Sequence, residues 1–417
     1  MQSISRVLRD EKVGLYAMVF LANMGWGVMS PVLANVQAEF AVSVVQVALA
    51  NSVFGIARLV LDVPIGLLID RIDQKWLRFS GAAVLAIGSA LCASAVSFPM
   101  LLWGRLLNGV GAAIIQVTNL VWISRLSTPE RRGRDLGVYQ AVFQAGTSVS
   151  PMAGGFLADL FGWRSSFWFA AGAAVLGFLP MLLGPQDWIE RVRVAQPVET
   201  HKVKGPTARR PEDPRRARQA LFVANLVTFV LFFSVGGFQN TVIPLFGSQM
   251  LELEAGAIGL ALGVSTILRF VMSLVGGELS DRFGRRAVLI PGLLVIGVGT
   301  LMFNLATNLT TFWLAIMVLS FGRFGNNVPA TVLADHALPE RWGLIMGLNR
   351  SVGDLGIVLG PVVMGLLLES QGYASATVFS AVLVWLCALA VAWGVSEVQP
   401  HRSLIGDLRQ AVRAAIK

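Results

Sequence analysis

The sequence predicts an all-α polytopic membrane protein in which twelve transmembrane helices form two pseudo-symmetric six-helix bundles. Three observations support this fold class. Of the 417 residues, 55% are hydrophobic and only 14% are charged, whereas about a quarter of an average soluble domain is charged. Apolar runs of about 20 residues, the length that crosses a bilayer core, recur along the chain. A charged motif also repeats about half a chain later, which indicates a duplicated architecture.

The apolar runs divide the chain into twelve candidate spans. The first follows Arg6, Arg9 and Lys12, but its run is too long for a signal peptide and lacks a convincing cleavage site, so we expect it to remain uncleaved. The spans are expected at residues 14–35, 46–68, 78–97, 100–122, 137–159, 165–184, 220–243, 256–278, 287–306, 311–333, 344–367 and 374–395. Because their number is even, both termini should lie on one side of the membrane.

The basic loops predict the orientation, because lysine and arginine are retained in short cytoplasmic loops. The loops after the second, fourth, eighth and tenth spans are basic, whereas the opposite loops contain Glu39, Glu252, Glu254 and Glu369, with Arg164 as their clear cation. We therefore expect cytoplasmic termini and a location in the inner (plasma) membrane. The net charge of +9 reflects this placement, so no nucleic-acid partner is expected.

Composition also predicts the domain boundaries. Residues 185–219 are rich in proline and arginine and have few apolar side chains to bury, so we expect a mobile or partly ordered cytoplasmic linker there. Its charge follows the positive-inside rule, with contact to anionic lipid as the alternative. The bundles are then residues 1–184 and 220–395. Residues 396–417 place apolar side chains on one helical face, which predicts an amphipathic tail on the cytoplasmic leaflet.

The repeat joins a charged helix to a charged loop in each half. Arg58 and Arg269 are 211 residues apart, and so are Asp70 and Asp281. Each aspartate falls at a cytoplasmic helix end, where it can accept hydrogen bonds from the first amides of a facing helix in the other half. We expect these contacts near Gly347 for Asp70 and near Gly137 for Asp281.

These motifs resemble those of the major facilitator superfamily over essentially the full chain. The loop signature G-x-x-x-D-R-x-G-R-K is matched by Gly66, Asp70, Arg71 and Lys75, although Asp73 and Gln74 depart from it. The second copy fits better, through Gly277, Asp281, Arg282, Gly284, Arg285 and Arg286. The resemblance implies that both loops belong to a gate, with Asp70 and Arg71 as a latch that breaks as the halves rock. A simple stop-transfer charge cluster is the alternative.

Two further motifs are similar to motifs of this family, and the second of them is similar to that of its drug:proton antiporter branch. The fourth span contains R-x-x-x-G-x-G as Arg105, Gly109 and Gly111. The fifth span matches G-x-x-x-G-P-x-x-G-G through Gly146, Pro151, Gly154 and Gly155, with Ser150 in place of one glycine. The resemblance implies efflux. Close packing of transmembrane backbones at small residues is the alternative explanation.

Charged residues inside the spans are candidates for proton coupling, because each costs several kcal/mol unless it has a partner or a wet cavity. Arg58 and Asp62 are four residues apart, as are Arg350 and Asp354, so each pair is expected to share a helix face. Either these are neutral structural pairs, or Asp62 or Asp354 exchanges protons when its arginine moves away. The resemblance implies that Arg105 tunes this exchange.

Arg269 lacks an acid one turn away, because Ser273 stands where the first half has Asp62. Together with Arg58 it could clamp a carboxylate or another anion near the midplane. Pairing with an acid on a neighbouring helix and snorkelling toward the interface are the alternatives.

The resemblance further implies that the first, fourth, seventh and tenth spans line a central cavity. The candidate lining residues are Asn23, Trp26, Arg58, Gln116, Asn119, Asn225, Gln239, Asn240, Arg269, Arg323, Asn326 and Asn327. Amide side chains donate and accept hydrogen bonds and can orient a ligand without fixing its charge. Hydrogen bonding between helices is their alternative role.

The sequence therefore predicts a secondary transporter that works by alternating access and is not an enzyme. It has no phosphate-binding loop, catalytic constellation or metal-ligand cluster, so the proton gradient is the expected energy source and no cofactor is expected. Proton-coupled efflux of a small organic or amphipathic molecule is the leading function. The alternatives are transport of an organic anion through Arg58 and Arg269, and a non-transporting sensor built on a transporter fold. The expected partners are the small-molecule substrate, protons and the lipid bilayer, with the monomer as the functional unit.

Overall fold

The computed structural model describes residues 11–69, 72, 74–127, 131–183, 214–338 and 341–395, and all regular structure in these ranges is helical. The first half contains α2 (Glu11–Asn23), α3 (Leu33–Phe40), α4 (Val44–Leu68), α5 (Gln74–Ala93), α6 (Phe98–Leu126), α7 (Arg132–Phe161) and α8 (Arg164–Leu183). The second contains α10 (Pro214–Phe233), the π-helix η1 (Ser234–Val242), α11 (Ile243–Leu251), α12 (Ala255–Phe283), α13 (Arg285–Leu301), η2 (Met302–Leu305), α14 (Leu309–Phe321), η3 (Gly322–Gly325), α15 (Val328–His336) and α16 (Trp342–Gly394).

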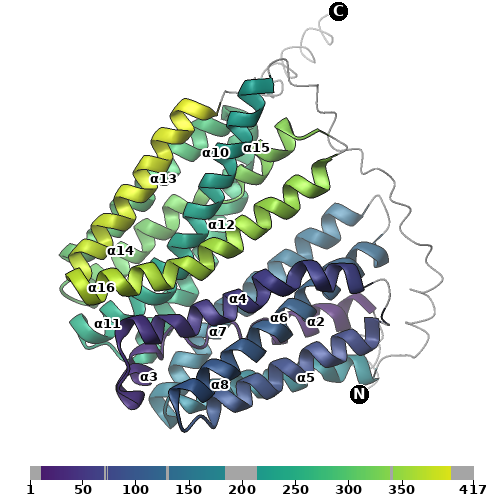
Figure 1. The fold of residues 1–417 in the computed structure, drawn as a ribbon, viewed down its shortest axis with the longest axis vertical. Helices are drawn as coiled ribbons and strands as arrows, with labels where there is room; N and C mark the ends of the chain where they lie inside the picture. Colours follow the sequence, from purple (N-terminus) through teal and green to yellow (C-terminus); the bar gives the residue numbers. More distant parts are fainter. Residues whose placement is uncertain are drawn as a thin grey trace, which may run out of the picture.

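These elements make the twelve predicted membrane crossings in two bundles. Seven helices in the described ranges are long and apolar enough to cross a membrane by themselves, and the last of these, Leu344–Gly394, contains two crossings. The chain turns back within α16 at Gly372, whose φ of 79° lies in the left-handed region that favours glycine. Figure 1 shows the two bundles side by side, with α4 and the part of α16 before Gly372 running along their boundary, while the yellow part of α16 after Gly372 lies at the outer edge.

Several crossings are less regular than predicted. The first is broken between α2 and α3, the seventh contains η1, and the tenth is broken at η3. Glycines at these points allow backbones to approach closely: a Cβ on Gly237 of η1 would lie 2.6 Å from the carbonyl oxygen of Gly360 in α16. The breaks therefore serve packing between helices that are distant in the sequence.

The seventh crossing also begins earlier than predicted. Helix α10 starts at Pro214, so residues 214–219 are helical rather than part of the linker. Proline is well tolerated in a first helical turn, where its missing N–H has no partner to lose. The rest of the predicted linker and the predicted tail at 396–417 lie outside the described residues, as do Asp70, Arg71 and the Lys75 side chain of the first loop motif.

Among the described residues, the apolar core is continuous between the halves at one end of the bundle and divided at the other. The end with the basic loops, where Arg131, Arg282 and Arg341 lie, is called the basic end, and the opposite end with Glu39 and Glu369 is called the acidic end. At the acidic end, one cluster of buried side chains includes residues of both halves, from Val28 to Leu368. Toward the basic end, separate clusters belong to the second half and to the first half. The halves are thus joined at the acidic end and apart at the basic end.

Candidate functional site

A cavity of about 480 Å³ lies between the halves, which is the size of a site for a drug-sized molecule. Both halves contribute to its wall. The lining includes Trp26, Asn51, Phe54, Arg58, Arg105, Gln116, Gln140, Phe143, Gln144, Phe232, Gln239, Asn240, Thr266, Arg269, Phe270, Ser273, Asn326 and Asn327.

Most of the predicted lining residues lie on this wall, but four do not. Asn23 and Asn119 line a smaller neighbouring pocket within the first half. Asn225 accepts a hydrogen bond from Asn349 Nδ2 at 3.2 Å and donates to Leu221, so it joins helices instead. Arg323 is fully buried behind the wall.

The structure also adds lining residues that were not predicted. Asn51, Gln140, Gln144 and Thr266 come from the second, fifth and eighth crossings, which also face the cavity. Gln140 and Gln144 could have been identified from the sequence, since their spacing of four residues places both on one face of the helix α7.

The intramembrane ion pairs cross from one half to the other, which corrects the predicted pairing within each helix. Arg58 of α4 pairs with Asp354 of α16 at 3.4 Å. Reciprocally, Arg350 of α16 donates to Asp62 Oδ2 through Nη2 at 2.6 Å and through Nε at 2.9 Å. The first pair is buried, whereas Arg350 is about one-third exposed.

Close packing of α4 on α16 explains the crossed pairing. Ser52 Oγ donates to the carbonyl oxygen of Val358 at 2.7 Å, and a Cβ on Gly55 would lie 3.0 Å from Val358 Cγ2. The neighbouring helix is thus within reach of the long arginine side chains. Within one helix, a basic residue followed by an acid four positions later is also the weaker orientation of such a pair.

Arg58 and Arg105 have further partners in the first half. Arg58 Nη2 donates to Gln116 Oε1 at 3.0 Å, and its guanidinium lies 4.3 Å from the ring centre of Trp26. Arg105 Nε donates to the carbonyl oxygen of Ala50 at 3.1 Å. Both arginines are therefore held in place by the protein.

The arginines of the second half have fewer partners. Arg323 Nη2 donates to Ser234 Oγ at 3.1 Å, while its Nε and Nη1 have no hydrogen-bond partner in the described ranges. Arg269 lies on the cavity wall, and no described residue forms a hydrogen bond or ion pair with it. One alternative for Arg269 was an ion pair with an acid on a neighbouring helix. No such ion pair is present among the described residues.

The motif helix α7 packs through its small residues against two other helices. A Cβ on Gly146 would lie 2.5 Å from the carbonyl oxygen of Phe20 in the first crossing. A Cβ on Gly155 would lie 2.2 Å from Ala255 O, and one on Gly259 of α12 would lie 2.1 Å from Pro151 O. These glycines allow α7 and α12 to touch backbone to backbone.

Two carboxylates close the acidic end in matching ways. Asp159 at the end of α7 accepts a hydrogen bond from the N–H of Gly256 in α12 at 2.8 Å. Glu369 of α16 accepts one from the N–H of Val45 in α4 at 3.1 Å. Each acid thus caps the first turn of a helix in the other half, where free amides and the helix dipole favour a negative charge.

A third contact lies between these caps. Gln249 Nε2 donates to Gln37 Oε1 across the halves at 2.9 Å, and the hydroxyl of Tyr373 donates to Gln249 Oε1 at 2.6 Å. Hydrogen bonds and the shared apolar core therefore both hold the acidic end closed.

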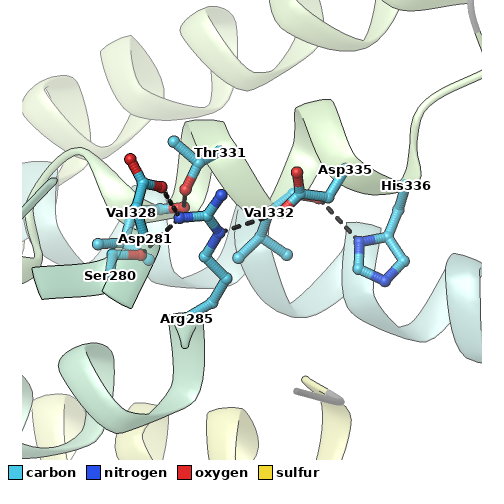
Figure 2. Close-up of polar contacts among 8 residues, drawn as sticks. All are labelled: Ser280, Asp281, Arg285, Val328, Thr331, Val332, Asp335 and His336. Atoms are coloured by element: carbon cyan, nitrogen blue, oxygen red, sulfur yellow. Dashed lines mark hydrogen bonds and ion pairs between the residues drawn. The ribbon is translucent and has the colours of Figure 1, made fainter. Parts of the chain in front are cut away.

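The second loop motif at the basic end is held by ion pairs within its own half (Figure 2). Arg285 Nη1 pairs with Asp281 at 2.5 Å, and Arg285 Nε donates to Asp335 Oδ2 of α15 at 3.0 Å. Arg285 also donates to Ser280 Oγ at 2.9 Å, while Arg282 pairs with Glu278.

The expected cap of Asp281 on the facing helix is not formed in this conformation. Gly137 of α7 and Gly347 of α16 have open space where a Cβ would stand. Gly66 and Gly277, the motif glycines at the ends of α4 and α12, have the same open surroundings. The halves are therefore separated at the basic end, and this conformation is open there and closed at the acidic end.

Comparisons with known proteins agree with this architecture. The sequence profile of the Major Facilitator Superfamily matches residues 15–254 and 226–417. Multidrug resistance protein 2 of Bacillus subtilis is 22% identical over 85% of this chain and 88% of that protein. The protein named "Probable nitrate transporter NarT" of Staphylococcus epidermidis is 23% identical over 88% of this chain and 91% of that protein.

A solved structure has the same fold. The crystal structure of a POT family transporter in complex with 5-aminolevulinic acid aligns with a TM-score of 0.72 at 14% identity, covering 92% of this chain and 95% of that one. Two helical halves, a cavity between them and a family match along the chain agree with one another. The chain therefore belongs to the Major Facilitator Superfamily and is a membrane transporter of small molecules rather than an enzyme.

Proposed function

We propose that this transporter exports small organic or amphipathic molecules in exchange for protons, by alternating access of its two halves. The crossed ion pairs carry the proposal. Because Arg58–Asp354 and Arg350–Asp62 each join one half to the other, rocking of the halves has to separate arginine from aspartate. An aspartate that loses its arginine in a poorly solvated place gains affinity for a proton. Proton uptake and the change of conformation are then one event.

The same scheme also assigns the open end of the cavity to one side of the membrane. Basic loops mark the cytoplasmic side of membrane proteins, so the basic end and the open side of the cavity face the cytoplasm. The protein then stands ready to take up cargo from inside the cell. Asp281 would cap α7 near Gly137 in the opposite conformation, in agreement with the gating role expected of the second loop motif.

The relatives support export more than they define the cargo. One relative is named a multidrug resistance protein and another a probable nitrate transporter. The charge of the cargo therefore has to be inferred from the cavity of this chain. In the proposed cycle, the positive charge of Arg105 on the cavity wall tunes the proton affinity of the crossed pairs. A single chain suffices for transport because the cavity lies within it.

Flux measurements in proteoliposomes with an imposed pH gradient test the proposal. Neutral, cationic and carboxylate probes are offered to the wild type and to Asp62→Asn, Asp354→Asn and Glu252→Gln. Glu252 is an exposed acid outside the cavity and outside the loop motifs, and it serves as the matched control. Loss of gradient-driven accumulation in at least one of the first two variants, with downhill exchange retained, is expected. Full gradient-driven exchange in both would exclude these aspartates as proton carriers.

The same assay separates a transporter from a sensor. A sensor on a transporter fold would show no flux of any probe, with or without a gradient. Substrate-dependent flux in the wild-type protein would by itself exclude a sensor.

A further inference from the structure

The charged side chains around the cavity do not cancel. Five arginines of the membrane interior are Arg58, Arg105, Arg269, Arg323 and Arg350. Two of them pair with Asp62 and Asp354. Arg105, Arg269 and Arg323 have no carboxylate partner in the ranges that the structure describes. Arginine stays protonated in proteins, so three positive charges stand uncompensated in a region where each costs several kcal/mol.

The cavity wall is also positively charged, even though one of its arginines, Arg58, is paired with Asp354. Three arginines, Arg58, Arg105 and Arg269, belong to the lining, and no aspartate or glutamate of the described chain does. A cleft lined by one sign of charge concentrates ions of the opposite sign. The wall therefore favours a negatively charged cargo.

Arg269 is the arginine that remains available to such a cargo. Arg58 is engaged by Asp354 and Gln116, and Arg105 is almost fully buried and donates to Ala50. Arg269 is partly exposed on the wall with its guanidinium donors unused by the described residues. The predicted clamp of Arg58 with Arg269 is thus not available in this conformation, and the binding centre lies in the second half.

Arg323 reinforces this centre from behind the wall. It is fully buried and is fixed by Ser234. It belongs to η3, which packs closely on α12, the helix of Arg269: a Cβ on Gly276 of α12 would lie 1.7 Å from the carbonyl oxygen of Phe324. Two positive charges on such closely packed elements repel each other. Asn326 and Asn327, about one helical turn after Arg323, line the cavity and supply neutral hydrogen-bond donors. An anion beside Arg269 would relieve the repulsion and use these donors.

The surroundings of Arg269 also indicate an organic body on the anion. Phe232, Val235 and Phe270 form an apolar part of the same wall. A cavity wall that combines aromatic and aliphatic side chains with an unpaired guanidinium fits a molecule with a hydrocarbon portion and one anionic group.

We propose that the cavity binds organic anions, whose carboxylate or similar group pairs with Arg269, supported from behind by Arg323, while the body packs against Phe232 and Phe270. The proposal rests on the proposed transport function and names its substrate class. Ser273, at the position equivalent to Asp62, leaves Arg269 free for the cargo.

Equilibrium binding to the purified full-length protein tests this without any gradient. Three probes share one body and differ in charge: 2-naphthoate, 2-naphthamide and 2-naphthylmethylammonium. Wild-type protein should bind the carboxylate at least about tenfold more tightly than the amide, since a charge-assisted pair is worth more than 1.4 kcal/mol. The ammonium compound should bind weakest.

Variants test whether Arg269 causes the preference for the carboxylate probe. Arg269→Gln should lose most of the preference for 2-naphthoate over 2-naphthamide, because only the more distant positive charges remain. Arg269→Lys should keep a larger part of it because it retains the charge without the bidentate geometry. Arg134→Gln removes an exposed charge at the basic end and should bind as the wild type does. Thermal unfolding of each variant establishes that it is folded before its binding is compared.

The outcomes separate this proposal from that of proton-coupled export. Equal or tighter binding of the amide or ammonium probe to the wild type, or an unchanged preference in folded Arg269→Gln, would overturn the anion site. Anion binding at Arg269 without gradient-driven flux would retain the site and reject proton coupling.

Discussion

The seam between α4 and α16 and the seam between α7 and α12 occupy equivalent places in the repeat but are built differently. The first contains four charges in two crossed pairs. In the second, the positions equivalent to Arg350 and Asp354 are Gln140 and Gln144, and Ser273 replaces Asp62. Of the four positions in the second seam that correspond to the charged residues of the first, only that of Arg269 carries a charge.

The two seams differ in packing as well. At the second seam the backbones touch through Gly155 and Gly259, whereas at the first the contact at Gly55 is with the side chain of Val358. The difference teaches that equivalent seams can be stabilised in different ways, one by ion pairs and one by close backbone packing. The charged seam satisfies its own charges and links the halves electrostatically, whereas the glycine seam leaves Arg269 without a carboxylate partner among the described residues. Each of the following predictions changes one of these seams, or an end of the bundle, and compares the effects.

Breaking the buried pair of the charged seam should have the largest effect on stability. Asp354→Asn leaves Arg58 buried without its carboxylate, which is expected to cost about 3–5 kcal/mol in the free energy of unfolding. The double variant Arg58→Gln/Asp354→Asn should recover most of that loss because neither charge is left alone. Unfolding in mixed detergent micelles measures both.

A double-mutant cycle decides which pairing is real in solution. Coupling between Arg58 and Asp354 should exceed that between Arg58 and Asp62 by more than about 1 kcal/mol. The reverse order would mean that the pairs form within helices after all.

A side chain at the glycine seam should have the next largest effect. In Gly259→Val, the new Cβ meets the backbone oxygen of Pro151, which cannot rotate aside. Overpacking of this kind costs about 1–3 kcal/mol, so transport should fall about tenfold or more. Flux in proteoliposomes measures it, with Gly172→Val as the control because Gly172 has open space around it. Wild-type flux in Gly259→Val would show that the close seam is not needed.

Removing the caps at the acidic end should have a smaller, symmetrical effect. Asp159→Asn and Glu369→Gln each weaken one cap, which is worth about 1 kcal/mol. Each should shift the population toward the conformation open at the acidic end by about fivefold, and the double variant by the product.

Distances between spin labels follow this opening. Labels at Val96 and Leu305, which are exposed at the acidic end of each half, should move apart in a larger fraction of molecules. The native Cys92 and Cys387 are buried and should remain unlabelled. Identical distance distributions in the wild type and the double variant would remove the caps from the closing mechanism.

The smallest effect is expected at the basic-end loop. In Asp335→Asn, Arg285 retains Asp281, and the pair is partly solvated, so the loss should stay below about 1 kcal/mol. Thermal unfolding at low and high salt measures it. A loss as large as that of Asp354→Asn would remove the distinction between surface and seam pairs.

Much of the fold could be predicted from the sequence because it depends on local properties. Apolar length sets the number of crossings, and the repeat of Arg58 with Arg269 indicates two related halves. The crossed pairs could not be predicted, because a spacing of four residues describes one helix and says nothing of the neighbour that packs on it. The breaks near Gly27 and Gly322 were detectable as glycine clusters, but their purpose depends on which distant backbone approaches.

The candidate site was only partly predictable for a related reason. The family resemblance directed attention to four of the crossings, so Asn51, Gln140 and Gln144 were missed although they lie on the cavity wall. Arg323 was placed on the wall because it is a polar residue of the tenth span, which the resemblance assigns to the cavity. The structure instead buries it between helices, where it donates to Ser234.

The two caps at the acidic end are related by the repeat, since Asp159 precedes Glu369 by 210 residues and Val45 precedes Gly256 by 211. Each half therefore supplies one carboxylate acceptor and one backbone N–H donor, which bond to the donor and the acceptor of the other half. This is the geometry of an isologous dimer interface, in which the same patch on two identical subunits binds itself. A single six-helix unit with these features could assemble with a second copy and close this end unaided. The charged seam has no such counterpart, since Gln140 and Gln144 stand where Arg350 and Asp354 lie, so two copies related by this symmetry would form the caps at both places but the crossed pairs at only one.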